Sequence, residues 1–163
     1  MTSPFLKSYD GQTTEELIAL EGQYRIDSLV LAFEQGIEQK AQPSTEESYV
    51  LAVEALEREV NNGGFAQFFV NSSGEFAAII EQSLRAINCP KTADIARDAL
   101  EALDVDGEIS AESVAEAVSE GGEHVEQQLA ECDDRCFAND EPIADRLFAW
   151  IKANRAAIRV GDA

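Results

Sequence analysis

The amino-acid sequence predicts an all-α fold, a single-domain bundle of about seven helices over residues 1–163. Three observations support this expectation. Apolar residues recur three and four positions apart, which places them on one side of a helix. Capping signals precede several of these apolar segments. Alternation of β-branched and polar residues, which is typical of strands, is absent.

The first two predicted helices begin with capping boxes, in which a hydroxyl and a carboxylate three residues later cap the helix together. Thr13 and Glu16 form the first box, and a helix over residues 13–36 follows. Ser44 and Glu47 form the second box, and this helix ends at the Asn and Gly residues of 61–64. The inward stripe of the first helix consists of Leu17, Leu20, Tyr24 and Leu31.

The remaining helices are separated by Gly, Pro and Asp residues. Three phenylalanines within residues 65–69 form a short aromatic turn, and a helical pattern over 76–87 ends before Pro90. It should pack antiparallel to a helix over 95–103. After a turn at residues 104–107, a sixth helix runs to Gly121-Gly122 and a further segment runs to about Phe137. Pro142 opens the last helix, which carries an apolar stripe to Ile158.

The charge is far from balanced. The chain has 12 basic and 32 acidic residues, a formal net charge of −20. Its apolar share of 45% is that of a globular protein, so it is expected to fold. Such a field repels nucleic acid and anionic lipid and attracts basic protein surfaces. We therefore expect no direct nucleic-acid binding. A generic solvated acidic surface, or adaptation to high salt, also produces this composition.

The amino terminus and the cysteines indicate the compartment. Residues 1–7 lack the basic stretch and long apolar run of a signal peptide, and no apolar stretch is long enough to span a bilayer. Cys89, Cys132 and Cys136 are an odd number of cysteines in a chain without an export signal. We expect a cytoplasmic protein with reduced thiols and no membrane partner.

The distribution of the acidic residues is the most informative feature. Thirteen of them lie between Asp98 and Asp134, and no Lys or Arg interrupts them. A helix that is acidic only for solubility usually mixes both signs, because Glu and Lys four residues apart stabilise each other by about 0.2 to 0.5 kcal/mol. This run lacks that stabilisation. A solvated acidic face without a partner is the simplest alternative explanation.

Four glutamates recur every four residues and should lie along one side of a helix, opposite an apolar side. They are Glu108, Glu112, Glu116 and Glu120. Their rise of about 6 Å per step gives the row about half the axial charge density of one DNA strand, which carries a charge about every 3.4 Å, and neighbouring helices must therefore contribute. A second copy of the chain would lengthen the pattern. We interpret the acidic residues as phosphate mimics that bind a protein partner. The candidates are Asp94, Asp98, Glu101, Asp104, Asp106, Glu108, Glu112, Glu116, Glu120, Glu123, Glu126, Asp133 and Asp134.

No residue pattern indicates catalysis, a metal or a cofactor. Residues 102–113 resemble a calcium loop, but Ala102 and Ser113 occupy its first and last ligand positions. Cys132, Cys136 and His124 lack a fourth zinc ligand, and the thiols are expected in the helix core. No Ser or Cys has an activating neighbour, and no glycine loop has phosphate-binding spacing. We expect a protein that is not an enzyme.

Residues 61–74 read Asn61-Asn62-Gly63-Gly64-Phe65-Ala66-Gln67-Phe68-Phe69-Val70-Asn71-Ser72-Ser73-Gly74. This segment resembles the signature of a bacterial family whose named member is a DNA-mimic protein. The likeness covers most of the chain from Ser44 onward, with further matches at residues 86–87 and 91–93, near Phe137 and in the final helix. The Asn-Gly-Gly-Phe and Gln-Phe-Phe elements are specific.

This resemblance implies an all-helical homodimer that occupies the DNA-binding surface of a helix-turn-helix transcription factor and blocks its operator binding. The signature carries no charge, so it is expected to shape the fold, and it identifies no contact residues. The alternative function is an acidic adaptor, or an immunity-type inhibitor of another basic protein such as a nuclease or toxin. A small enzyme with an unrecognised site is a third possibility.

Overall fold

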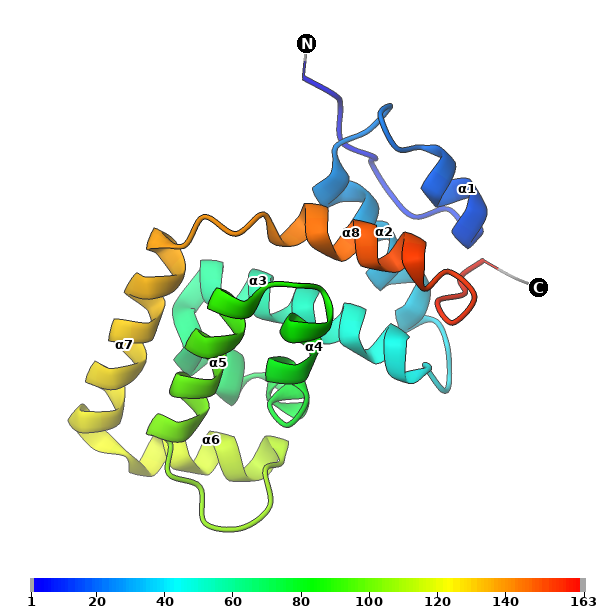
Figure 1. Ribbon diagram of the computed structural model, residues 1–163. Helices are drawn as coiled ribbons and strands as arrows, with labels where there is room; N and C mark the ends of the chain where they lie inside the picture. Colours follow the sequence, from blue (N-terminus) through cyan, green and yellow to red (C-terminus); the bar gives the residue numbers. More distant parts are fainter. Residues whose placement is uncertain (1, 162–163) are drawn as a thin grey trace. The chain divides into compact units, whose positions relative to one another are not determined.

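The computed structural model describes residues 2–161 and confirms the all-α prediction (Figure 1). Eight α-helices and one 3-10 helix form within this range, and no β-strand does. In chain order they are α1 (Thr14–Ala19), α2 (Ile26–Glu38), α3 (Thr45–Val70), the 3-10 helix η1 (Ser72–Phe76), α4 (Ile80–Ala86), α5 (Pro90–Ala102), α6 (Ala111–Glu120), α7 (Gly122–Ala138) and α8 (Ile143–Ala153).

The helices are grouped into two compact units. The first unit comprises Met1–Glu54 and Pro142–Ala163, and the second comprises Ala55–Glu141. The expectation of a single domain therefore stays a prediction. Every candidate carboxylate of the acidic run belongs to the second unit.

The first predicted helix is in fact two helices. Its Thr13–Glu16 capping box is confirmed, but α1 ends at Ala19 and the chain turns through Gly22, whose φ is +86°. Only glycine adopts such a φ without strain. Because α2 begins anew at Ile26, its buried stripe shifts and Leu31 is 40% exposed instead of buried. The buried stripe of α2 contains Leu29, Val30, Phe33 and Ile37.

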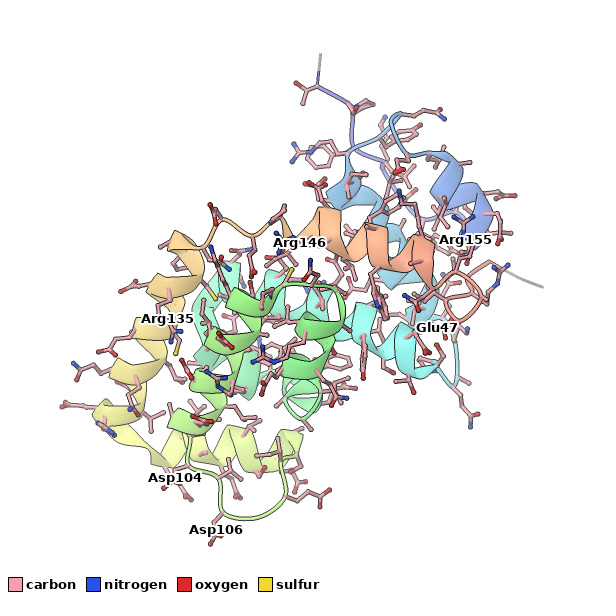
Figure 2. All side chains as sticks on the ribbon, viewed as in Figure 1. Glu47, Asp104, Asp106, Arg135, Arg146 and Arg155 are labelled. Atoms are coloured by element: carbon pink, nitrogen blue, oxygen red, sulfur yellow. The ribbon has the colours of Figure 1, made fainter. Side chains whose placement is uncertain are left out.

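Glu47 holds the first unit together at the start of α3. The Ser44–Glu47 capping box is confirmed, and the carboxylate also accepts hydrogen bonds from Lys40 Nζ at 2.6 Å and the Arg159 backbone N–H at 2.7 Å (Figure 2). Burial alone would raise the pKa of Glu47, but these bonds lower it below its ordinary value. They tie the carboxyl-terminal segment to α3.

That segment differs from the sequence prediction at its end. Pro142 directly precedes α8, but the helix ends at Ala153, so Ile158 lies outside it. Ile158 is nevertheless buried, and its carbonyl accepts a hydrogen bond from the buried Thr14 hydroxyl at 2.8 Å. The chain after α8 is therefore part of the core of the first unit.

Gly64 interrupts α3, and the expected aromatic turn is instead a short helical segment that ends at Val70. Its φ is +85°, so the helix that begins at Thr45 is interrupted there, as the sequence predicts. Phe65, Phe68 and Phe69 follow and are 0–1% exposed. The three rings pack on one another, with centroids 5.5 and 6.1 Å apart. This cluster is the core on which the rest of the second unit is built.

Figure 1 shows how the second unit presents its helices. α4 and α5 pack as the expected antiparallel pair, and α7 packs along α5 and runs in the opposite direction. α6 crosses one end of these helices and contacts η1 and α7. None of the helices within residues 2–161 is both long and apolar enough to span a bilayer.

Replacing Gly64 with alanine should destabilise the protein by about 2 to 4 kcal/mol. The backbone of an alanine at this position would be held at a positive φ, and its Cβ would collide with the Asp133 carboxylate. Gly107→Ala is the matched control, because Gly107 has a φ of +103° and no neighbouring atom lies within 4 Å of the place that a Cβ would take. It should cost only about 1 to 2 kcal/mol. Urea unfolding measures both values, and equal losses would contradict the predicted collision.

Candidate functional site

The structure divides the thirteen candidate carboxylates into two sets. All of them lie on α5, α6, α7 or the connecting loop, within the second unit. Three are bound by other groups of the protein. The other ten are exposed and form no ion pair with any residue between 2 and 161.

Asp94 and Asp98 on α5 are neutralised by arginines. Arg85 Nη2 lies 2.8 Å and Arg97 Nη1 3.3 Å from Asp94 Oδ1. Arg135 Nη1, from α7, lies 2.8 Å from Asp98 Oδ2. The hydrogen bond from Arg135 is the main reason that the pKa of Asp98 lies below its ordinary value. Both residues were predicted as phosphate mimics, but their charges are already balanced within the fold.

Asp133 has a structural role in the fold. Its Oδ1 accepts a hydrogen bond from the Phe65 backbone N–H at 2.8 Å, directly after the bend at Gly64. Burial is the largest influence on this carboxyl and raises its pKa. Asp133 therefore anchors α7 to the aromatic cluster.

The exposed set forms what we call the acidic surface. It contains the ten remaining candidates and Glu131, which belongs to the same run but was not among the candidates. No Lys or Arg lies between Asp98 and Asp134 in the sequence, and this signal also covers Glu131. The acidic surface consists of Glu101, Asp104, Asp106, Glu108, Glu112, Glu116, Glu120, Glu123, Glu126, Glu131 and Asp134.

The predicted row of four glutamates is shorter than expected. Ser110 caps α6 by accepting a hydrogen bond from the Ser113 N–H, and the helix begins at Ala111. Glu108 therefore lies in the preceding loop, with Asp104 and Asp106 (Figure 2). The row on the helix consists of Glu112, Glu116 and Glu120. All three are exposed, while Val114 on the other side is fully buried.

α7 adds carboxylates beside this row. Val125, Leu129 and Cys132 form its buried stripe, and Glu123 and Asp134 project from the opposite side. As Figure 1 shows, α6 lies across the end at which α7 begins. Exposed carboxylates thus lie on the loop, on α6 and on α7.

Two polar clamps hold α7 against α5. The Asp98–Arg135 pair joins α5 to the last turn of α7. Glu141, after α7, accepts hydrogen bonds from the Thr92 N–H at 2.7 Å and the Lys91 N–H at 3.0 Å, at the start of α5. A carboxylate at a helix amino terminus is stabilised by the helix dipole and the unpaired N–H groups. The clamps therefore fix the helices that carry much of the acidic surface.

The cysteines offer no reactive thiolate. Burial raises the pKa of the Cys132 thiol and raises that of Cys136 to about 12. Cys89, Cys132 and Cys136 form no disulfide. Over residues 2–161, no group of three or more His, Cys, Asp or Glu side chains has the arrangement of a metal site.

Asp98→Asn and Asp133→Asn should change the pH dependence of stability in opposite directions. The lowered pKa of Asp98 stabilises the fold above the unfolded-state pKa, and this contribution is lost as pH falls through the folded-state value. Its removal should cost about 0.5 to 1 kcal/mol at pH 7 and nothing in strong acid, since water partly screens the pair.

The raised pKa of Asp133 has the opposite sign, because its contribution is complete below the unfolded-state pKa and is lost as pH rises through the folded-state value. An asparagine oxygen still accepts the Phe65 N–H without the buried charge, so Asp133→Asn should not destabilise the protein at pH 7. Urea unfolding of both variants and the parent at several pH values measures this. Equal curves for the two variants would contradict the assignment.

Comparison with known proteins identifies the family. Residues 41–154 match the model of the DMP19-like proteins, named after DNA mimic protein 19. No curated protein and no solved structure matches the chain. The matched segment runs from before α3 to the end of α8 and contains the complete acidic surface. Since it covers well over half of the 163 residues, the chain belongs to the DMP19-like protein family.

Proposed function

We propose that this protein is a DNA mimic whose acidic surface binds the DNA-binding surface of a helix-turn-helix transcription factor and keeps that factor from its operator. The observation that carries the proposal is the set of eleven exposed carboxylates without an ion-pair partner in residues 2–161. Family membership supports the mimic role, and DNA-mimic families are generally non-enzymatic.

The physical basis is the replacement of phosphates by carboxylates. DNA-binding proteins neutralise phosphates with Lys and Arg side chains and hold them by charge-assisted hydrogen bonds. A carboxylate accepts the same hydrogen bonds. A row of them also steers a basic partner and accelerates association, and salt weakens this effect. The same field repels DNA, so the proposed target is the DNA-binding protein and not the DNA itself.

Internal neutralisation is our reason for leaving Asp94 and Asp98 out of the proposed binding surface. Arg85, Arg97 and Arg135 balance the charges of α5 near Asp94 and Asp98. The uncompensated charge begins at Glu101 and continues over the loop, α6 and α7. A basic partner is therefore attracted toward this end of the second unit.

A second copy of the chain would match the symmetry of the proposed partner. Dimeric helix-turn-helix proteins read two half-sites about one turn of DNA apart, roughly 34 Å. A homodimer of the mimic would present two acidic surfaces to the two recognition helices. We therefore include a homodimer in the proposal.

The double variant Glu112→Lys/Glu116→Lys should weaken partner binding by about 10- to 100-fold, because it removes two attractive charges and adds two repulsive ones. The salt dependence of binding should also become less steep. Asp10→Lys/Asp145→Lys is the control, since it changes the net charge equally at exposed carboxylates of the first unit. It should alter affinity by less than about threefold.

The partner for this measurement comes from affinity capture on the immobilised full chain at low salt. A captured helix-turn-helix protein that is displaced from its operator by the mimic, in a gel-shift assay, supports the proposal. Capture of a nuclease or toxin instead would replace it with the inhibitor alternative. Unchanged affinity of the α6 variant, with its helical circular dichroism intact, would refute the assignment of the acidic surface.

A further inference from the structure

A groove lies between α5 and α7 inside the acidic surface. Its volume is about 310 Å³, at the small end of the range for ligand sites. Arg135, labelled in Figure 2, extends from α7 toward α5 and donates a hydrogen bond to Asp98. The groove is lined by Asp98, Glu101 and Ala102 from α5 and by Gln128, Glu131, Cys132 and Arg135 from α7.

The charges of the lining do not cancel. Arg135 is the one cation, and it donates to Asp98 at 2.8 Å. Glu101 on α5 and Glu131 on α7 have no ion-pair partner among the residues described. Three carboxylates against one guanidinium leave a net charge of −2 in the lining. A concave surface with one sign of charge concentrates the field and attracts a counter-ion.

Two further residues of the lining have side chains that make no hydrogen bond with the described part of the protein. Cys132 lines it, is only 5% exposed, and forms no hydrogen bond with any residue from 2 to 161. Its buried thiol is protonated, because burial raises its pKa. Gln128, also in the lining, has a side-chain amide with no hydrogen bond in the same range. Gln128 is only half-buried, so its amide is open to solvent and available to a ligand in the groove.

We propose that this groove accepts one arginine side chain of the partner protein, with its guanidinium held between Glu101 and Glu131. The inference rests on the proposed function, in which the partner is a basic protein. A guanidinium is planar, has five N–H donors and is more weakly hydrated than an ammonium group. It can therefore donate to carboxylates on both walls and to the Gln128 amide oxygen at once. A lysine presents a compact charge with fewer donors.

The groove would contribute differently from the exposed row on α6. Water and salt screen an exposed carboxylate, so Glu112 and Glu116 mainly accelerate association. Glu101 and Glu131 act on a side chain that is partly withdrawn from water, where charge-assisted hydrogen bonds are stronger. Arginine is also among the residues that dominate binding energy at protein interfaces. The groove would thus select partners by the position of one arginine.

A titration with a small probe tests this inference without the partner. The isotope-labelled full chain is titrated with N-acetyl-arginine methylamide, and NMR follows the Gln128 side-chain amide and the backbone amides of Ala102 and Cys132. We expect saturable shifts centred on these residues. The lysine analogue should bind more weakly, and the uncharged citrulline analogue should produce no saturable shift.

Two matched variants separate the groove from overall charge. Glu101→Gln/Glu131→Gln should weaken arginine binding by at least about fivefold. Glu112→Gln/Glu116→Gln makes the same change of charge on α6 and should alter it by less than about twofold. All four residues are exposed, so the NMR spectra of both variants should show an intact fold.

Several outcomes would overturn the groove assignment. They are shifts spread over α6 and α7 without saturation, equal weakening in the two variants, and equal binding of arginine and lysine. The proposed function fails separately, when affinity capture yields no helix-turn-helix protein. Arginine binding in the groove would stand in that case, because the titration contains no partner.

Discussion

The second unit has to stay folded against the mutual repulsion of its carboxylates. Exposed acidic residues crowd α6, α7 and the loop before them, with no interspersed lysine or arginine. Helices with this charge remain packed only if other interactions hold them. The aromatic cluster after Gly64 supplies the buried apolar surface, and Asp133 joins it to α7. The Asp98–Arg135 pair and the Glu141 cap add polar clamps between α7 and α5.

The acidic residues consequently have two roles, one inside the fold and one at its surface. Asp94, Asp98 and Asp133 are used internally, by arginines or by a backbone N–H, and so contribute to the architecture. The exposed carboxylates have no such partners in the described chain and are available to a basic protein. Because internal pairs hold the backbone of α5 and α7, a partner would meet carboxylates on ordered helices. Binding such a surface costs less conformational entropy than binding a disordered acidic tail.

The groove suggests how an acidic surface can also be selective. Charge alone attracts any basic protein, whereas a concave site with carboxylates on two walls favours a planar, multidentate cation. In this view the α6 row accelerates association with basic proteins in general. Glu101 and Glu131 bind tightly only those basic proteins that place an arginine in the groove. Specificity would then depend on where the partner places one arginine. The family signature contributes indirectly, since Gly64 and the three phenylalanines position α7.

Much of this protein can be predicted from its sequence because helix signals are local. Capping at Thr13, Ser44 and Ser110, the bend at the Asn-Gly segment and the all-α class follow from neighbouring residues. The unbroken acidic run is likewise visible in the chain, as is the family resemblance. Only the tertiary structure reveals which carboxylates are neutralised, because Asp98 and Arg135 are 37 residues apart and Phe65 and Asp133 are 68 apart. Long-range packing decides such pairs, and it also creates the groove between α5 and α7.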